Sequence, residues 1–140
     1  VVIIILVMIF ILPIGWILLV YPAEPFYVVT GEPVREAARA AGIQVTSSSD
    51  ITWQLPGAQG GKAYILEDDS GNILAVQTQI FESAESRDAA ILTFSAQSVG
   101  KGKTTGTMII VGDQVIHIGP DTGGILSRIG AELRKMQGVQ

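Results

Sequence analysis

The sequence predicts an α+β fold, in which an N-terminal transmembrane helix precedes a small domain with an antiparallel sheet of about five strands and helices on one face. Three observations lead to this prediction. Residues 1–20 are apolar apart from Pro13 and Gly15. Two later stretches of alternating apolar residues flank turn-forming residues, a pattern typical of β-hairpins. A segment with apolar residues at helical spacing follows each hairpin.

Residues 1–21 are expected to form a membrane anchor. A 20-residue helix is about 30 Å long, which matches the hydrocarbon core of a bilayer. Aromatic rings near its C-terminal end favour the membrane interface, and a proline kink is tolerated in lipid. The predicted anchor residues are Val1, Ile5, Phe10, Pro13, Trp16, Val20 and Tyr21. Their partners would be the lipid bilayer or neighbouring apolar helices.

The apolar segment also resembles the hydrophobic stem of type IV pilin-like subunits in its length and position. Stems of that family commonly carry a glutamate at the fifth residue, whereas this chain has Ile5. The resemblance implies an alternative arrangement, in which the apolar helix packs in the core of an extracellular filament. An uncleaved signal peptide fits less well, because the apolar run is longer than the usual core of about 7–15 residues.

Residues 22–32 are expected to form a tether between the anchor and the domain. Pro22 and Pro25 favour a stiff, extended chain. After the apolar segment, the first lysine or arginine in the chain is Arg35. Because basic residues mark the cytoplasmic flank of a membrane helix, the domain is expected to be extracytoplasmic.

The domain, residues 33–140, is expected to open with a helix. Pro33 suits the first helical position, alanines follow at helical spacing, and Gly42 is a natural stop. Residues 43–46 are expected to begin a strand, and residues 47–50, which are serines and an aspartate, to form a turn or loop.

The middle of the domain is expected to hold further strands. Residues 51–55 read as a strand, and the glycine-rich residues 56–61 are expected to break it. Residues 63–66 and 73–81 form the first predicted hairpin around the acidic turn 67–72. Four alternate residues of the second strand are expected to share one face: Leu74, Val76, Thr78 and Ile80.

A helix over residues 82–99 is expected next, with Ala89, Leu92 and Ala96 as candidates for its buried stripe. A second hairpin, residues 107–111 with 114–118, leads to a final helix over about 123–136. Asp121 or Thr122 would cap that helix. The resulting order, α–β–(ββα)–(ββα), suggests an internal ββα repeat.

Composition excludes several classes of function. The net charge is −4, and no basic run is longer than Arg134-Lys135, which argues against a nucleic-acid partner. The chain has no cysteine and one histidine, so thiolate and multi-histidine metal sites are excluded within one chain. No catalytic motif is recognised. The sequence therefore predicts no catalytic, cofactor-binding or metal-binding residues.

Four residues are candidates for a partner-binding surface: Trp53, Leu55, Pro56 and His117. The first three precede a glycine-rich segment that would let a partner approach closely, although core packing is the default interpretation of Trp53. His117 lies between two isoleucines, and strand alternation places it on the opposite face from both. It is thus expected at the solvent or at a helix interface.

The function predicted from these features is non-catalytic. A small domain on a single-pass anchor would act through protein–protein contacts, as an accessory or structural subunit of a membrane-associated assembly. The partners would be other protein subunits, including further copies of the chain. Two alternatives remain: a pilin-like filament subunit, and a membrane-tethered ligand-binding or sensory module.

Overall fold

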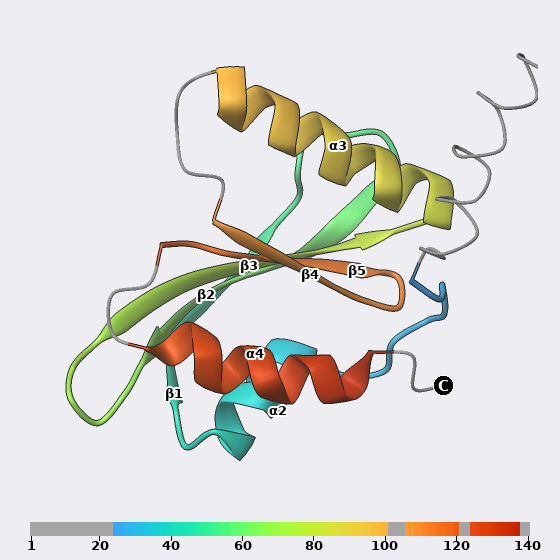
Figure 1. Ribbon diagram of the computed structural model, residues 1–140. Coiled ribbons are helices and arrows are strands. Elements are labelled where there is room, and N and C mark those ends of the chain that lie inside the picture. Colours follow the sequence, from blue (N-terminus) through green and yellow to red (C-terminus); the bar gives the residue numbers. More distant parts are fainter. Residues whose placement is uncertain (1–23, 101–105, 121–123, 138–140) are drawn as a thin grey trace, which may run out of the picture.

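The computed structural model describes residues 24–100, 106–120 and 124–137, and the described residues form five strands and three helices (Figure 1). The elements are α2 (Pro33–Ala40), β1 (Gln44–Ile51), β2 (Ala58–Glu67), β3 (Ile73–Phe81), α3 (Ala84–Gly100), β4 (Thr107–Val111), β5 (Gln114–Ile118) and α4 (Ile125–Met136). All strands pair antiparallel in one sheet, in the order β1-β2-β3-β5-β4. The predicted α+β class with a five-stranded antiparallel sheet is confirmed.

Both predicted hairpins are confirmed, and each turn uses residues suited to it. The carboxylate of Asp68 accepts backbone N–H bonds from Ser70 at 3.0 Å and Asn72 at 2.9 Å, which closes the β2–β3 turn. Gly112 adopts a φ of +57° in the β4–β5 turn, a conformation that favours glycine.

β1 corrects the prediction of a turn or loop at residues 47–50. Ser47, Ser48 and Ser49 all pair with β2, and the strand is irregular only at a shift between Val45 and Ser47. Serine is not a strong strand former, because its hydroxyl competes for backbone partners. At the edge of the sheet, however, the three serines stay exposed, so their hydroxyls are accessible to water and a serine-rich strand is tolerated.

The predictions for residues 51–55 and 56–61 are also wrong. Ile51 ends β1, residues 52–57 connect the strands, and β2 already begins at Ala58. A buried glutamine makes the glycine-rich strand start feasible. The Gln79 side chain accepts the Gly60 N–H at 3.2 Å and donates to the Ile51 carbonyl at 2.8 Å, so both backbone groups are satisfied.

Helices cover both faces of the sheet, which corrects the expectation of helices on one face. Figure 1 shows α3 above the sheet and α2 with α4 below it. The physical reason lies in β5, where Val115 and Ile116 are both fully buried. Neighbouring strand residues point to opposite faces, so both faces are apolar and each needs cover.

The larger core lies between the sheet and the pair α2 and α4. It contains apolar residues from both helices and from all strands except β1: Val34, Ala37, Ala38, Ile43, Tyr64, Leu66, Leu74, Val76, Ile109, Val111, Ile116, Ile118, Ile125, Ile129 and Leu133. The smaller core, under α3, is built on Phe81, Ala90 and Val115. The sheet residues Leu74 and Val76 share the α2–α4 face, as the alternation predicts.

The predicted buried stripe of α3 is wrong. Ala89 and Ala96 are exposed, and the side chain of Leu92 is 73% exposed. Arg87 and Ala90 are buried instead. The helix is turned so that an arginine, rather than leucine, faces the protein, which hydrophobic periodicity does not anticipate.

The two ββα segments share an order but not an arrangement. β3 and β5 pair antiparallel, and a local twofold axis through such a pair stands perpendicular to the sheet. A repeat about that axis would place α3 and α4 on the same face. They lie on opposite faces (Figure 1), so the predicted ββα order occurs twice but the two segments are not related by such an axis.

Among the described residues, no helix is long and apolar enough to cross a bilayer. The predicted anchor, residues 1–21, lies outside the described residues, as do the predicted capping residues Asp121 and Thr122.

Candidate functional site

Two of the four predicted surface residues, Trp53 and His117, meet around one α3 side chain, Phe94. The Trp53 ring stacks on Phe94 with centroids 6.2 Å apart, and His117 lies 4.8 Å from the same ring. Leu55 packs in the smaller core beside them, while Pro56 is exposed. The location of His117 fits a helix interface, one of the two positions expected for it. Phe94, which joins these residues, was not identified from the sequence.

Trp53 is held in place by polar contacts as well as by ring stacking. Its indole Nε1 donates a 3.0 Å bond to the Gln77 side chain, and its backbone N–H donates at 3.2 Å to Gln79. A groove of about 340 Å³ remains beside it, lined by Trp53, Gln54, Leu55, Gln77 and Phe94. The ring is therefore largely a packing element, with one margin open to the groove.

The opposite face carries a polar hollow of about 420 Å³ near the N-terminus of α2. The Tyr64 hydroxyl donates a 2.8 Å bond to Glu32, and Lys62 pairs with Asp50 in the same hollow. This hydrogen bond from Tyr64 is the main cause that lowers the pKa of Glu32 below its ordinary value, and the Arg35 guanidinium adds to the effect. Each charged group already has a partner of opposite charge, so the hollow has little charge left for a ligand.

The free edge of β1 is the most open hydrogen-bonding surface that the structure describes. β1 is eight residues long, pairs only with β2, and exposes six of its residues, while Val45 and Ile51 are half-buried. The other edge strand, β4, is shorter, and the Gln137 side chain donates a 2.9 Å bond to its Ile110 carbonyl. Unpaired N–H and C=O groups on a long edge are a template for another strand.

A groove of about 530 Å³ runs beside this edge, between β1 and α2. Its lining includes two arginines of α2: Arg35 and Arg39. Arg35 is engaged with Glu32 at 3.0 Å and with the Ser48 hydroxyl at 3.3 Å, while Arg39 is exposed. The groove is therefore basic in a protein whose net charge is −4.

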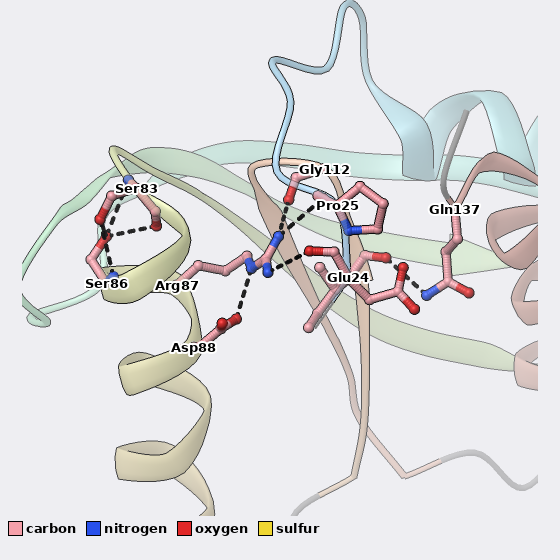
Figure 2. Close-up of polar contacts among 9 residues, drawn as sticks. Glu24, Pro25, Ser83, Ser86, Arg87, Asp88, Gly112 and Gln137 are labelled. Carbon is pink, nitrogen blue, oxygen red and sulfur yellow. Dashed lines mark hydrogen bonds and ion pairs between the residues drawn. The ribbon is translucent and has the colours of Figure 1, made fainter. Parts of the chain in front are cut away.

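Arg87 is a fully buried cation that binds the first described residues to the domain (Figure 2). Its Nη2 donates to the Glu24 carbonyl at 2.9 Å, and its Nη1 donates to Pro25 at 3.3 Å and to Gly112 at 2.7 Å. Its Nε pairs with Asp88 at 2.9 Å. A planar guanidinium with five N–H donors suits such a cluster of carbonyls better than lysine would.

Further contacts extend this attachment along the chain. The Arg87 guanidinium lies 5.7 Å from the centre of the Phe26 ring. The Tyr27 hydroxyl donates to the Met136 carbonyl at 2.9 Å, and the Val29 N–H donates to Asp113 at 3.2 Å. The described part of the predicted tether thus lies against the domain.

Nothing in the local sequence indicates the role of Arg87. Its carbonyl partners lie 25, 62 and 63 residues away in the chain, so only the folded structure brings them together.

Within the described residues, no group of three or more histidine, cysteine, aspartate or glutamate side chains is placed to hold a metal ion. Comparison with known proteins gives no matching family model, no similar curated protein and no similar solved structure.

Proposed function

We propose that the protein acts by binding other proteins rather than by catalysis, as an accessory or structural subunit of a membrane-associated assembly. The apolar segment 1–21 would anchor it in the bilayer, with the domain outside the cytoplasm. The observation that carries the proposal is the free edge of β1. A partner would add an extended strand to this edge and continue the sheet by main-chain hydrogen bonds.

Two features of β1 favour strand addition. Asp50 is its only charged residue, and it contains no proline or lysine, the residues with which proteins usually protect exposed edges. Asp50 is moreover paired with Lys62 on β2 at 2.6 Å, which neutralises its charge. An eight-residue edge of this kind is a strong candidate for pairing.

The Arg87 attachment supports a role within an assembly. Because Arg87 ties the backbone at Glu24 and Pro25 to the domain, a chain that leaves the membrane near residue 21 would hold the domain close to the bilayer. A fixed position limits the orientations of the β1 edge. This lowers the entropic cost of binding a partner anchored in the same membrane.

The test uses the full chain, extracted in mild detergent, and measures the protein mass of the native particle by light scattering. Two matched variants, Ser48→Pro and Ser49→Pro, separate the edge from the fold. Neighbouring strand residues point their N–H groups to opposite sides, so one variant removes a bond to β2 and the other only an outward N–H, which an edge strand tolerates. Thermal denaturation identifies the tolerated one.

The proposal expects a discrete particle much heavier than one 14.8 kDa chain, which the tolerated proline variant reduces to a single chain. An unchanged particle in that variant contradicts a role for the β1 edge. Micrometre-scale fibres that dissolve in detergent would instead support the filament alternative. If the unaltered chain is a monomer, both the assembly proposal and the filament alternative are contradicted. The ligand-binding alternative is then tested by shifts in melting temperature on addition of ligands.

A further inference from the structure

We infer that the partner segment that pairs with β1 is acidic, with carboxylate side chains at alternate positions that reach Arg35 and Arg39. This inference rests on the proposed function and specifies the chemistry of its partner. It starts from the basic groove between α2 and the β1 edge, whose lining carries no acidic residue.

The chain geometry places both arginines along the edge. Only residues 41–43 join α2 to β1, so the chain reverses direction there. The 3.3 Å bond from Arg35 to the Ser48 hydroxyl shows that the strand returns alongside the helix. Arg39, one turn later in α2, accordingly lies toward the start of the strand, where Gln44, Val45 and Thr46 also line the groove.

The spacing of the arginines matches an extended segment. Residues four apart in a helix are separated by about 6 Å along its axis. Side chains two apart in a strand lie on one face, about 6.8 Å from each other. A strand added to β1 therefore presents successive side chains of its α2 face at about the interval that separates the two arginines along the helix axis.

The charge state of the groove favours carboxylates. Arg39 is exposed at the end of α2, and Arg35 shares its charge with a single glutamate, Glu32. Carboxylates on the partner would form charge-assisted hydrogen bonds with these guanidinium groups. Basic side chains at the same positions would be repelled. The groove would therefore bind acidic extended segments in preference to basic ones.

The test measures binding of a fluorescently labelled peptide, Thr-Glu-Thr-Glu-Thr-Glu-Thr with blocked ends, to the detergent-solubilised full chain. The peptide in which lysine replaces glutamate is the control for charge. Arg39→Glu is the variant of the groove. Arg134→Glu is its matched control, since Arg134 is an exposed arginine on α4 and the change in net charge is identical.

We expect the acidic peptide to bind, the lysine peptide to bind at least tenfold more weakly, and Arg39→Glu to weaken acidic-peptide binding about tenfold. Arg134→Glu should change it less than twofold. The inference is overturned if the acidic peptide does not bind, or if the two peptides bind equally well. It is also overturned if the acidic peptide binds Arg39→Glu as well as it binds the unaltered chain. A homodimer that joins two β1 edges also overturns it, because a second copy would then occupy the site.

Methylated peptides separate this inference from the proposed function. Methylating the backbone nitrogens of either all glutamates or all threonines blocks the N–H groups on one side of the peptide only. Strand addition requires that one of these two peptides loses binding and the other keeps it. If both bind equally, main-chain pairing at β1 is contradicted. If one methylated peptide loses binding while Arg39→Glu leaves binding of the unmethylated acidic peptide unchanged, the edge pairs as proposed and only the acidic chemistry is wrong.

Discussion

The guanidinium Nη1 of Arg87 donates a 2.7 Å hydrogen bond to the carbonyl oxygen of Gly112, in the turn between β4 and β5. The same group also binds the Glu24 and Pro25 carbonyls. One side chain of α3 therefore joins the first described residues to the turn between β4 and β5. A buried cation of this kind stabilises the fold only while its acceptors remain in place.

Replacing Arg87 by methionine is expected to lower the free energy of unfolding by about 3 kcal/mol, because it leaves the buried Gly112 carbonyl and the part-buried carbonyls of Glu24 and Pro25 without this donor. Urea denaturation measures the change. Asp88→Asn is the control: the Asp88 side chain is 44% exposed, so its ion pair should contribute less than about 1 kcal/mol. Equal losses in the two variants would show that the carbonyl contacts carry no special weight.

Gly112→Ala is expected to destabilise the protein by about 2–4 kcal/mol. The added Cβ would meet the Tyr27 carbonyl and a Val29 methyl, each at 2.6 Å, in addition to the strain of positive φ. Gly71 is a matched control, since its φ of +82° is also positive but its Cβ would meet nothing within 4 Å. Gly71→Ala should cost about 1 kcal/mol. If the melting temperature of Gly112→Ala is no lower than that of Gly71→Ala, the close approach of residues 27–29 to Gly112 is contradicted.

Tyr64→Phe is expected to make the stability less dependent on pH. The Tyr64 hydroxyl is the main cause of the lowered pKa of Glu32, whose ordinary value is 4.5. A carboxyl with a lowered folded pKa stabilises the fold fully above its unfolded pKa, and loses this contribution as the pH falls through the folded pKa. The variant should thus be about 1 kcal/mol less stable at pH 7, since Glu32 is half-exposed, and should approach the unaltered protein as the pH falls from 4.5 through the lowered pKa of Glu32.

Tyr27→Phe is the control for this measurement. The Tyr27 hydroxyl donates to the backbone carbonyl of Met136, which does not titrate. Its stability loss should stay constant between pH 3 and pH 7. If the loss for Tyr64→Phe is equally constant, Tyr64 has no effect on the protonation of Glu32.

Gln79→Met is expected to cost about 3 kcal/mol, and Gln77→Met about 1 kcal/mol, by urea denaturation. The buried Gln79 amide satisfies backbone groups of Ile51, Trp53 and Gly60. Gln77 accepts only the Trp53 indole bond among the side-chain hydrogen bonds found for it in the described residues. Similar losses in the two variants would mean that the start of β2 does not depend on Gln79.

Local patterns were sufficient to predict much of the fold. Alternation and turn residues located both hairpins, and Pro33 with Gly42 located α2. The serines of β1 were not recognised as a strand, because their pairing with β2 depends on a neighbour distant in sequence rather than on their own propensity. The sequence did hold a signal for cover on both faces of the sheet. Val115 and Ile116 are consecutive apolar residues in one strand, and both are buried.

The candidate sites were less predictable than the fold. Trp53 and His117 were singled out by residue type, and the structure brings both to Phe94. The Arg87 cluster depends on backbone carbonyls, which every residue has, and so leaves no trace in the local sequence. The basic groove likewise arises only when α2 folds back beside β1.

Amide hydrogen exchange along β1 tests strand addition most directly. The assembled particle is compared, residue by residue over Gln44–Ile51, with the single chain obtained in a harsher detergent. If a partner strand pairs with the edge, the outward N–H groups, which occur at every second residue, become strongly protected in the particle and exchange rapidly in the single chain. Outward β1 amides that exchange at the same rapid rate in both forms would contradict the proposed function.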